Sequence, residues 1–210
     1  MFGIAISSSS PAVAARCSHA RAGTGVVASQ NVTDPNLGIS GLEMLGMGAT
    51  AEEALARLVA STPFAAYRQL AIVDAQGRVA GRSGARTLGI YAMAKGTGCI
   101  AAGNLLATPD VPGRMIAAFE ASRNALPSRL LAALAAGLEG GGEAGPVRSA
   151  GLLVVREVTW PVVDLRIDWH DSPIAALRDL WGVYEPQMED YVRPALDPNA
   201  APSFGVPGDE

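Results

Sequence analysis

Blocks of hydrophobic residues separated by polar segments predict two strands and a helix in the first third of this chain. Residues 2–7 (FGIAIS) and 23–29 (GTGVVAS) are short apolar runs with β-branched side chains, a pattern typical of buried strands. We expect the polar segment between them to be a crossing loop. Apolar residues then recur at helical spacing over residues 51–61, with Thr50 as N-cap and Glu53 placed to complete a capping box.

The rest of the chain continues this succession of strands and helices. Residues 69–85 predict a β-hairpin around the turn DAQG, because Asp74 can accept hydrogen bonds from the turn backbone and Gly77 can adopt a positive φ. The further expected elements are a buried strand from residue 98 to Gly103-Asn104, a helix over 112–122, a helix from Pro127 that the glycines of 140–145 terminate, strands at 149–157 and 160–170, and one helix over 172–192.

Strands and helices come in groups rather than in strict alternation, which favours antiparallel sheets covered by helices over a doubly wound parallel sheet. The predicted fold class is therefore α+β, in the form of a four-layer αββα sandwich. We expect residues 1–193 to form a single domain and the Pro- and Ala-rich residues 194–210 to be an irregular C-terminal tail.

Composition limits the classes of function. Of the 210 residues 49% are hydrophobic, 17% charged and only 5% aromatic, so a sizeable core of small aliphatic side chains is expected. The net charge of -4, without a Lys/Arg cluster, argues against a nucleic-acid partner. No run approaches the roughly 20 apolar residues of a membrane helix, and no basic segment precedes the apolar start. A soluble, cytoplasmic protein without a membrane partner is predicted.

The chain has few residues suited to metal or disulfide chemistry. Its two cysteines, Cys17 and Cys99, are too few and too far apart for a metal knuckle or a disulfide framework, and two buried thiols are the simpler interpretation. The two histidines, His19 and His170, lack a spacing suited to zinc. We therefore predict no metal and no organic cofactor.

Uncharged polar residues gather where the strand at residues 23–29 ends, and this density suggests a binding site. Gln30, Asn31 and Asp34 can present donors and acceptors to an amide, and Asn104 arrives from a second strand end. We expect Gln30, Asp34 and Asn104 to line one cleft. Asx turns formed by Asn31 and Asp34 are an equally good explanation. Arg21 could face an anionic substrate group or could simply be solvated.

Nucleophilic catalysis has weaker candidates in this sequence. The run Ser7 to Ser10 offers hydroxyl groups, but a serine needs a base within hydrogen-bond reach, and no G-x-S-x-G motif is present. A polar strand end whose hydroxyls satisfy backbone groups is the favoured interpretation. Cys17 is expected to be buried, although Arg16 and Arg21 nearby could lower its pKa.

Several motifs, in order, resemble one family along nearly the whole chain. They are FGIAISSSSPAVAARC, HARAGTGVVASQ, the turn from Asp34-Pro35 to Gly38, QLAIVDAQGRVA followed by SGA, and AAGNLL. This pattern is similar to the family of unknown function DUF1028, which is assigned to the N-terminal-nucleophile (Ntn) hydrolase superfold. The resemblance implies an αββα sandwich and amide hydrolysis by an N-terminal Thr, Ser or Cys whose own amine is the base.

The chain departs from that family at its start. Members usually carry a further strand and turn before the residues that match Phe2-Gly3-Ile4, whereas this chain begins at Met1. Either the sequence is truncated or the family does not use the standard nucleophile, and the catalytic residue is not identifiable here. We expect the 210-residue chain to hydrolyse amides poorly, and the sheet edge beside Gly3 to Ser7 to be unpaired.

The expected function is that of an amidohydrolase acting on a small amide-containing metabolite. The alternative is a catalytically silent small-molecule binding or assembly protein on the same sandwich. A homodimer is predicted as well, because the helices are rich in Ala and Leu and a sheet with few aromatic residues gains burial through a partner.

Overall fold

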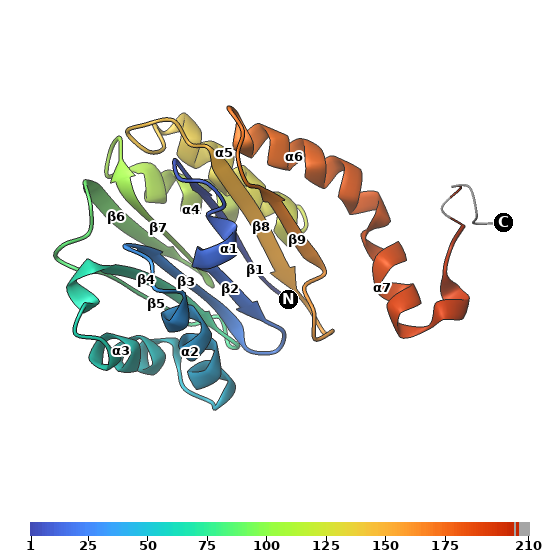
Figure 1. Cartoon of the computed structure of the whole chain (residues 1–210), viewed down its shortest axis with the longest axis horizontal. Coiled ribbons are helices and arrows are strands. Elements are labelled where there is room, and N and C mark those ends of the chain that lie inside the picture. The colour runs from blue at the N-terminus through green and yellow to red at the C-terminus, as the bar shows by residue number, and fades with distance from the viewer. Residues whose placement is uncertain (204, 206–210) are drawn as a thin grey trace.

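The computed structural model describes residues 1–203 and 205. Its strands lie in the middle of the molecule, with helices on either side (Figure 1). The elements of the first half are β1 (Phe2–Ser8), α1 (Ala14–Cys17), β2 (Ser18–Arg21), β3 (Gly25–Asn31), α2 (Pro35–Gly46), α3 (Ala51–Ser61), the 3-10 helix η1 (Ala65–Tyr67), β4 (Arg68–Asp74) and β5 (Val79–Ser83). Those of the second half are β6 (Ile90–Gly96), β7 (Cys99–Leu106), α4 (Val111–Ala121), α5 (Leu126–Glu139), β8 (Ser149–Val155), β9 (Val163–Ile167), α6 (Pro173–Tyr184), the 3-10 helix η2 (Glu185–Gln187), α7 (Met188–Leu196) and the 3-10 helix η3 (Pro198–Ala200).

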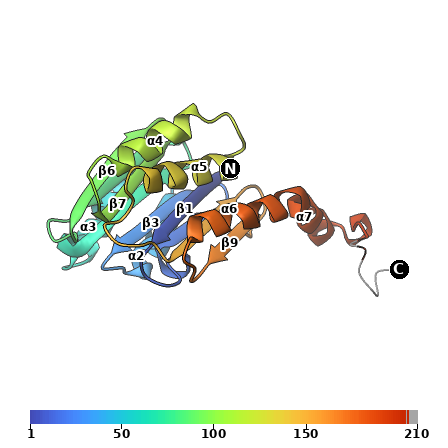
Figure 2. The same ribbon diagram turned by 90° about the horizontal axis from the view of Figure 1, so that it is seen from above.

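All strand pairs are antiparallel, so the predicted α+β class is confirmed. The strands form three sheets with the orders β2-β3-β4-β5, β1-β8-β9 and β6-β7. Helices α2 and α3 pack on the β2-β3-β4-β5 sheet, α4 on β6 and β7, α5 on β1, and α6 on β8 and β9 (Figures 1 and 2). Strands β1 and β7 also contact the β2-β3-β4-β5 sheet. Among the described strands, β1 and β7 each have one pairing neighbour and therefore one open edge.

The two larger apolar clusters hold most of these elements together, and small aliphatic residues dominate both, as the composition predicts. One lies between α2, α3 and the sheet, around the fully buried Val27, Leu58 and Ile72. The other joins β8 and β9 to α5 and α6, with Val163 and Leu177 at its centre. The burial of such side chains is the main force that fixes the helices on the sheets.

The two strongest local predictions of the first half are confirmed. Thr50 and Glu53 form a reciprocal capping box at the start of α3, with hydrogen bonds of 3.1 and 2.8 Å. The predicted hairpin is β4 and β5, and Gly77 in its turn has a φ of 76°. Asp74, which is 1% exposed, accepts hydrogen bonds from the turn and also from the Ala51 amide at the start of α3. The hairpin and the helix are thereby tied together.

Three segments differ from the prediction. The expected loop between the first two strands contains α1 and the short strand β2, whose residues Ser18 to Arg21 lack an apolar run and are recognisable only by pairing with β3. Strand β6 was not anticipated, because it is a partly exposed edge strand without clear alternation. The single helix expected over 172–192 is interrupted by η2, where Pro186 cannot continue the α-helical hydrogen bonding.

The C-terminal segment is more ordered than an irregular tail. Helix α7 reaches Leu196 and η3 covers Pro198–Ala200, both within the segment predicted to be irregular. Residues 204 and 206–210 of that segment lie outside the described residues. In the described part of the chain, no helix has the length and apolar character required to cross a membrane.

Candidate functional site

A cavity of about 250 Å³ lies between β1 and β7. Strands β3 and β4 form its floor, and helices α4 and α5 cover the opposite side. Most of its surface is apolar, as is usual for ligand sites, which have few, well-placed polar groups. Its polar lining side chains are Ser7, Gln30, Cys99, Asn104 and Glu143.

Three side-chain amides, which we call the amide cluster, meet beside this cavity: Gln30 and Asn104, which line it, and Gln69, which does not. The Oε1 of Gln69 accepts hydrogen bonds from Gln30 Nε2 at 2.8 Å and from Asn104 Nδ2 at 3.2 Å. Gln69 is fully buried, and its Nε2 donates to Ser83 Oγ and to the Gly103 carbonyl, both at 2.9 Å. Gln30 Nε2 also donates to the Ala102 carbonyl at 3.1 Å. The cluster thus links β3, β4 and β7.

The amide cluster brings together Gln30 and Asn104, two of the residues that the sequence singles out. Within the described hydrogen bonds, their side-chain oxygens accept nothing, so both oxygens remain available to a ligand. Gln69 was missed because it opens the apolar run of β4 and reads as part of a buried strand. The register of β3 against β4, which places Gln30 opposite Gln69, is the signal that identifies it.

Asn31 lies next to Gln30, but its side chain forms hydrogen bonds to backbone groups. It adopts a φ of 75°, and its Nδ2 donates to the Tyr67 carbonyl at 2.8 Å while its Oδ1 accepts from the Leu88 amide at 3.2 Å. The side chain therefore ties the end of β3 to the start of β4 and to the loop before β6. It does not line the cavity.

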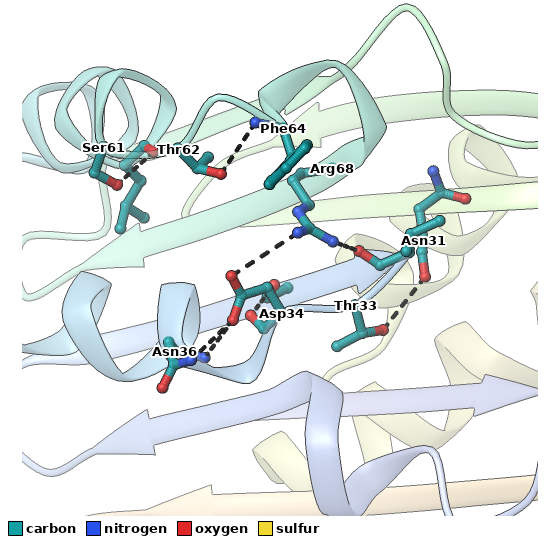
Figure 3. Close-up of polar contacts among 11 residues, drawn as sticks. Asn31, Thr33, Asp34, Asn36, Ser61, Thr62, Phe64 and Arg68 are labelled. Atoms are coloured by element: carbon teal, nitrogen blue, oxygen red, sulfur yellow. Dashed lines mark hydrogen bonds and ion pairs between the residues drawn. The ribbon is translucent and has the colours of Figure 1, made fainter.

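Asp34 also lies outside the cavity, so the prediction that it converges with Gln30 and Asn104 is wrong. It is the N-cap of α2, and its Oδ1 accepts from the Asn36 amide at 3.1 Å, which is the Asx-type turn considered as the alternative. Figure 3 shows Arg68 on its other side, with Arg68 Nη2 at 3.9 Å from Asp34 Oδ2. The Asp34 carboxylate is therefore used to cap α2 and to form an ion pair with Arg68.

Arg21 is exposed at the end of β2 and lies on the α2 side of the sheet. Its Nη1 is 3.4 Å from the Leu42 carbonyl, a long hydrogen bond to the last turns of α2. It is not part of the cavity lining. The position gives Arg21 no access to a ligand held by the amide cluster.

Comparison with known proteins identifies the family. The model of the "Family of unknown function (DUF1028)" matches residues 1–177. The chain belongs to the DUF1028 family. A crystal structure of a DUF1028 protein from Silicibacter pomeroyi is 34% identical to this DUF1028 chain, with a TM-score of 0.82, and the match covers 90% of this chain and 83% of the other. No curated protein matches this chain.

Two of the hydroxyl groups at residues 7–10 of this DUF1028 protein, those of Ser8 and Ser10, are used in local hydrogen bonds, and Ser8 Oγ accepts from the Ser10 amide at 3.1 Å. Ser8 Oγ and Ser10 Oγ lie 3.0 Å apart, and Arg16 donates to Ser10 Oγ at 2.6 Å. The Ser9 amide donates to both carboxylate oxygens of Glu143 at 3.2 Å. Ser7 alone of the four lines the cavity. These contacts favour the structural interpretation of the run.

The thiols and imidazoles of this DUF1028 protein are not arranged as a nucleophile and its base. Cys17 is buried and Cys99 lines the cavity, and burial raises the pKa of both thiols, with Glu120 adding to the effect at Cys99. Burial lowers the pKa of His19, and neither His19 nor His170 lines the cavity among the described residues. In the described part of the chain, no three His, Cys, Asp or Glu side chains gather as a metal site requires.

Proposed function

We propose that this protein binds a small amide-containing metabolite in the cavity and hydrolyses its amide bond as an Ntn-type amidohydrolase. The observation that carries the proposal is the amide cluster, in which Gln30 and Asn104 line a mostly apolar cavity and their side-chain oxygens accept none of the described hydrogen bonds. Such oxygens accept hydrogen bonds from the N–H groups of an amide ligand, while the apolar walls exclude water. Hydrolysis rests on the resemblance to the Ntn superfold.

We also propose that the elements form the four-layer αββα sandwich of that superfold. In this arrangement α2 and α3 are one outer layer, the β2-β3-β4-β5 sheet is the second, β1, β8 and β9 with β6 and β7 are the third, and α4, α5 and α6 are the fourth. The contacts of the helices with these strands, and those of β1 and β7 with the facing sheet, support it. The cavity then lies within the third layer, between β1 and β7, with the second layer below it and α4 and α5 of the fourth layer above it.

The Ntn mechanism leaves the catalytic residue of this protein unassigned. In that mechanism the α-amine of a terminal Thr, Ser or Cys takes the proton of its own side chain, and an amine with a pKa near 8 is partly neutral at pH 7. Mass spectrometry of the mature N-terminus, on protein purified from its natural host, identifies the residue. A terminal residue without a nucleophilic side chain would count against hydrolysis.

A catalytically silent binding protein is the second candidate function. It is favoured by the composition of the cavity wall, in which no described histidine stands beside Ser7 or Cys99 and the Cys99 thiol is held in its protonated form. Among the described lining residues only Glu143 could act as a base, and its carboxylate already accepts hydrogen bonds from the Ser9 amide. The two candidates share the ligand and differ in turnover.

Titration with a panel of small primary and N-acylated amides distinguishes the two functions. Ligand-observed NMR measures binding, and release of ammonia or free amine measures hydrolysis. Asn104→Ala and Gln30→Ala should each weaken binding about tenfold, the equivalent of one lost hydrogen bond. Asn124→Ala, at an exposed position beyond α4, is the control and should have no effect. Binding without release supports the silent protein, and absence of binding refutes both.

We further propose that the protein works as a homodimer in the cytoplasm. Its two cysteines are free, which suits a reducing compartment. Exposed apolar side chains on α6 and α7, Val183 and Leu196 among them, provide a surface that a second copy can cover. Sedimentation velocity at micromolar concentration should show a dimer, and cell fractionation should recover the protein with cytoplasmic markers. A monomer would contradict the proposed homodimer, and recovery outside the cytoplasm would contradict the proposed location.

A further inference from the structure

A hollow of about 480 Å³ lies over α5, between its neighbours α4 and α6 (Figure 2). Four of the α5 residues that line it are small: Ser128, Ala132, Ala135 and Ala136. They recur at helical spacing, so they form one stripe along α5. The hollow exists because these side chains do not fill the space between the two flanking helices. We call it the α5 groove.

The base of the α5 groove belongs to the core of the protein. Leu131 and Trp181 line it and are only 4% and 5% exposed, as members of the apolar cluster that joins α5 and α6 to β8 and β9. The indole Nε1 of Trp181 donates to Ser128 Oγ at 3.0 Å and thereby ties α6 to α5. A partner that docks in the groove therefore meets a fixed apolar base.

Two opposite charges also line the α5 groove, and both are unpaired. Glu139 of α5 and Arg178 of α6 are exposed, and neither forms an ion pair or a hydrogen bond through its side chain with the described residues. Arg178 lies one helical turn from Trp181, which contacts Ser128 at the start of the stripe. Glu139 is at the end of α5, about 16 Å from Ser128 along the helix axis. The positive and negative groups thus stand toward opposite ends of the groove.

A surface with opposite charges at its two ends is complementary to itself. A two-fold axis that lies in the interface, across the groove, reverses the direction of the groove in the second copy. Glu139 of one copy then faces Arg178 of the partner subunit, and the same pair forms again on the other side of the axis. Alanine at the crossing point allows two helices to approach closely, near the lower end of the 8–10 Å range of interaxial distances.

We propose that a second copy of this chain covers the α5 groove, with the two α5 helices packed antiparallel across a two-fold axis near Ala135. The inference rests on the proposed homodimer and names its interface. Apolar contact along the alanine stripe supplies burial, and the two pairs of Glu139 with Arg178 fix the direction of packing. Val183, about 200° around α6 from Trp181, lies on a different face of that helix.

Charge reversal tests the arrangement by sedimentation velocity at micromolar concentration, on the full chain. Glu139→Arg and Arg178→Glu each place like charges opposite one another in a homodimer, and each should weaken dimerisation at least about tenfold. An equimolar mixture of the two variants should form a mixed dimer, because the charges of one variant then face opposite charges of the other. A pairing of Glu139 with Arg178 inside one chain predicts no such recovery.

Matched variants locate the contact. Ala135→Arg puts a long charged side chain at the axis and should abolish dimerisation, whereas Ala56→Arg, on the exposed face of α3, should not. Arg123→Glu, at an exposed position between α4 and α5, is the control for Arg178→Glu. Circular dichroism verifies that each variant folds.

The outcomes separate this inference from the homodimer itself. A wild-type dimer that Ala135→Arg and both charge reversals leave intact overturns the α5 groove as the interface and keeps the homodimer. Weakened variants that fail to form a mixed dimer overturn the two-fold pairing of Glu139 with Arg178. A wild-type monomer refutes the homodimer and this interface together.

Discussion

Replacing Gln69 by leucine should destabilise the protein and weaken ligand binding together. Leucine is close to glutamine in size, so little volume is lost, but it forms no hydrogen bonds. Gln69 makes four with its side chain: it accepts from Gln30 and Asn104 and donates to Ser83 and Gly103. The substitution leaves all four partner groups without this contact.

The magnitude follows from where those partners lie. Gln30 and Asn104 border the cavity, where water can replace the lost acceptor, so each should lose only about 0.5 kcal/mol. Ser83 and the Gly103 carbonyl are also only partly buried, and about 1 kcal/mol each is a reasonable loss. The expected decrease in the free energy of unfolding is therefore about 3 kcal/mol, reduced somewhat by the apolar gain of leucine.

Urea denaturation followed by circular dichroism measures the free energy of unfolding of the wild-type protein and of the Gln69→Leu variant. The slope of this free energy against urea concentration should be the same for both proteins. The exposed Gln76→Leu variant, in the β4–β5 turn, is the control and should change stability by less than about 0.5 kcal/mol. The amide panel should bind about tenfold more weakly to the Gln69→Leu variant, because Gln30 and Asn104 lose their common anchor. A loss of stability below about 1 kcal/mol, with unchanged ligand binding, would refute the role assigned to Gln69.

Three further substitutions test individual contacts by denaturation. Burial alone would raise the pKa of Asp74, but hydrogen bonds from Ala51 and the turn outweigh it and hold this pKa below its usual value. The ionised carboxylate therefore stabilises the fold above about pH 4, and this stabilisation is lost as pH falls through the folded pKa. Asp74→Asn should lower the free energy of unfolding by about 2–4 kcal/mol at pH 7 and by less at pH 3, and a pH-independent difference would contradict this. Gly38→Ala would bring a Cβ to 2.0 Å from His19 Cδ2 and should cost about 1–3 kcal/mol, unlike Gly113→Ala, whose Cβ meets nothing within 4 Å. Asn31→Ala should be less stable than Asn31→Gly by about 1 kcal/mol, since the φ of 75° strains alanine alone, and equal stabilities would argue against strain.

Local signals in the sequence were sufficient for much of the secondary structure. The capping box at Thr50 and the turn at Asp74 each involve residues a few positions apart, so the pattern contains all the interacting groups. Strands such as β2 and β6 lack this property, because their pairing partners rather than their own side chains define them. Short or exposed strands are for that reason the elements most often missed.

The candidate site likewise contains residues that the sequence identifies and residues that only the structure identifies. Gln30 and Asn104 were recognised because each follows a buried run, and the fold brings those strand ends together. Asp34 has the same sequence environment, yet its carboxylate is used by the Asn36 amide two residues away. Nothing in the pattern distinguishes a polar residue that caps a helix from one that faces a cavity. Gln69 required the register of two strands, which only the three-dimensional structure supplies.

The order of strands in the β1-β8-β9 sheet has a consequence for biosynthesis. Phe2 at the start of β1 pairs with Val155 at the end of β8, whereas β2, β3, β4 and β5 are neighbours in sequence as well as in space. At about 5–20 residues per second, a ribosome makes β8 roughly 7–30 s after β1. During that interval the β2-β3-β4-β5 sheet can form with α2 and α3 by closing short loops, while β1 waits for its partner. Nascent chains are therefore most exposed to chaperones and to wrong strand partners at β1.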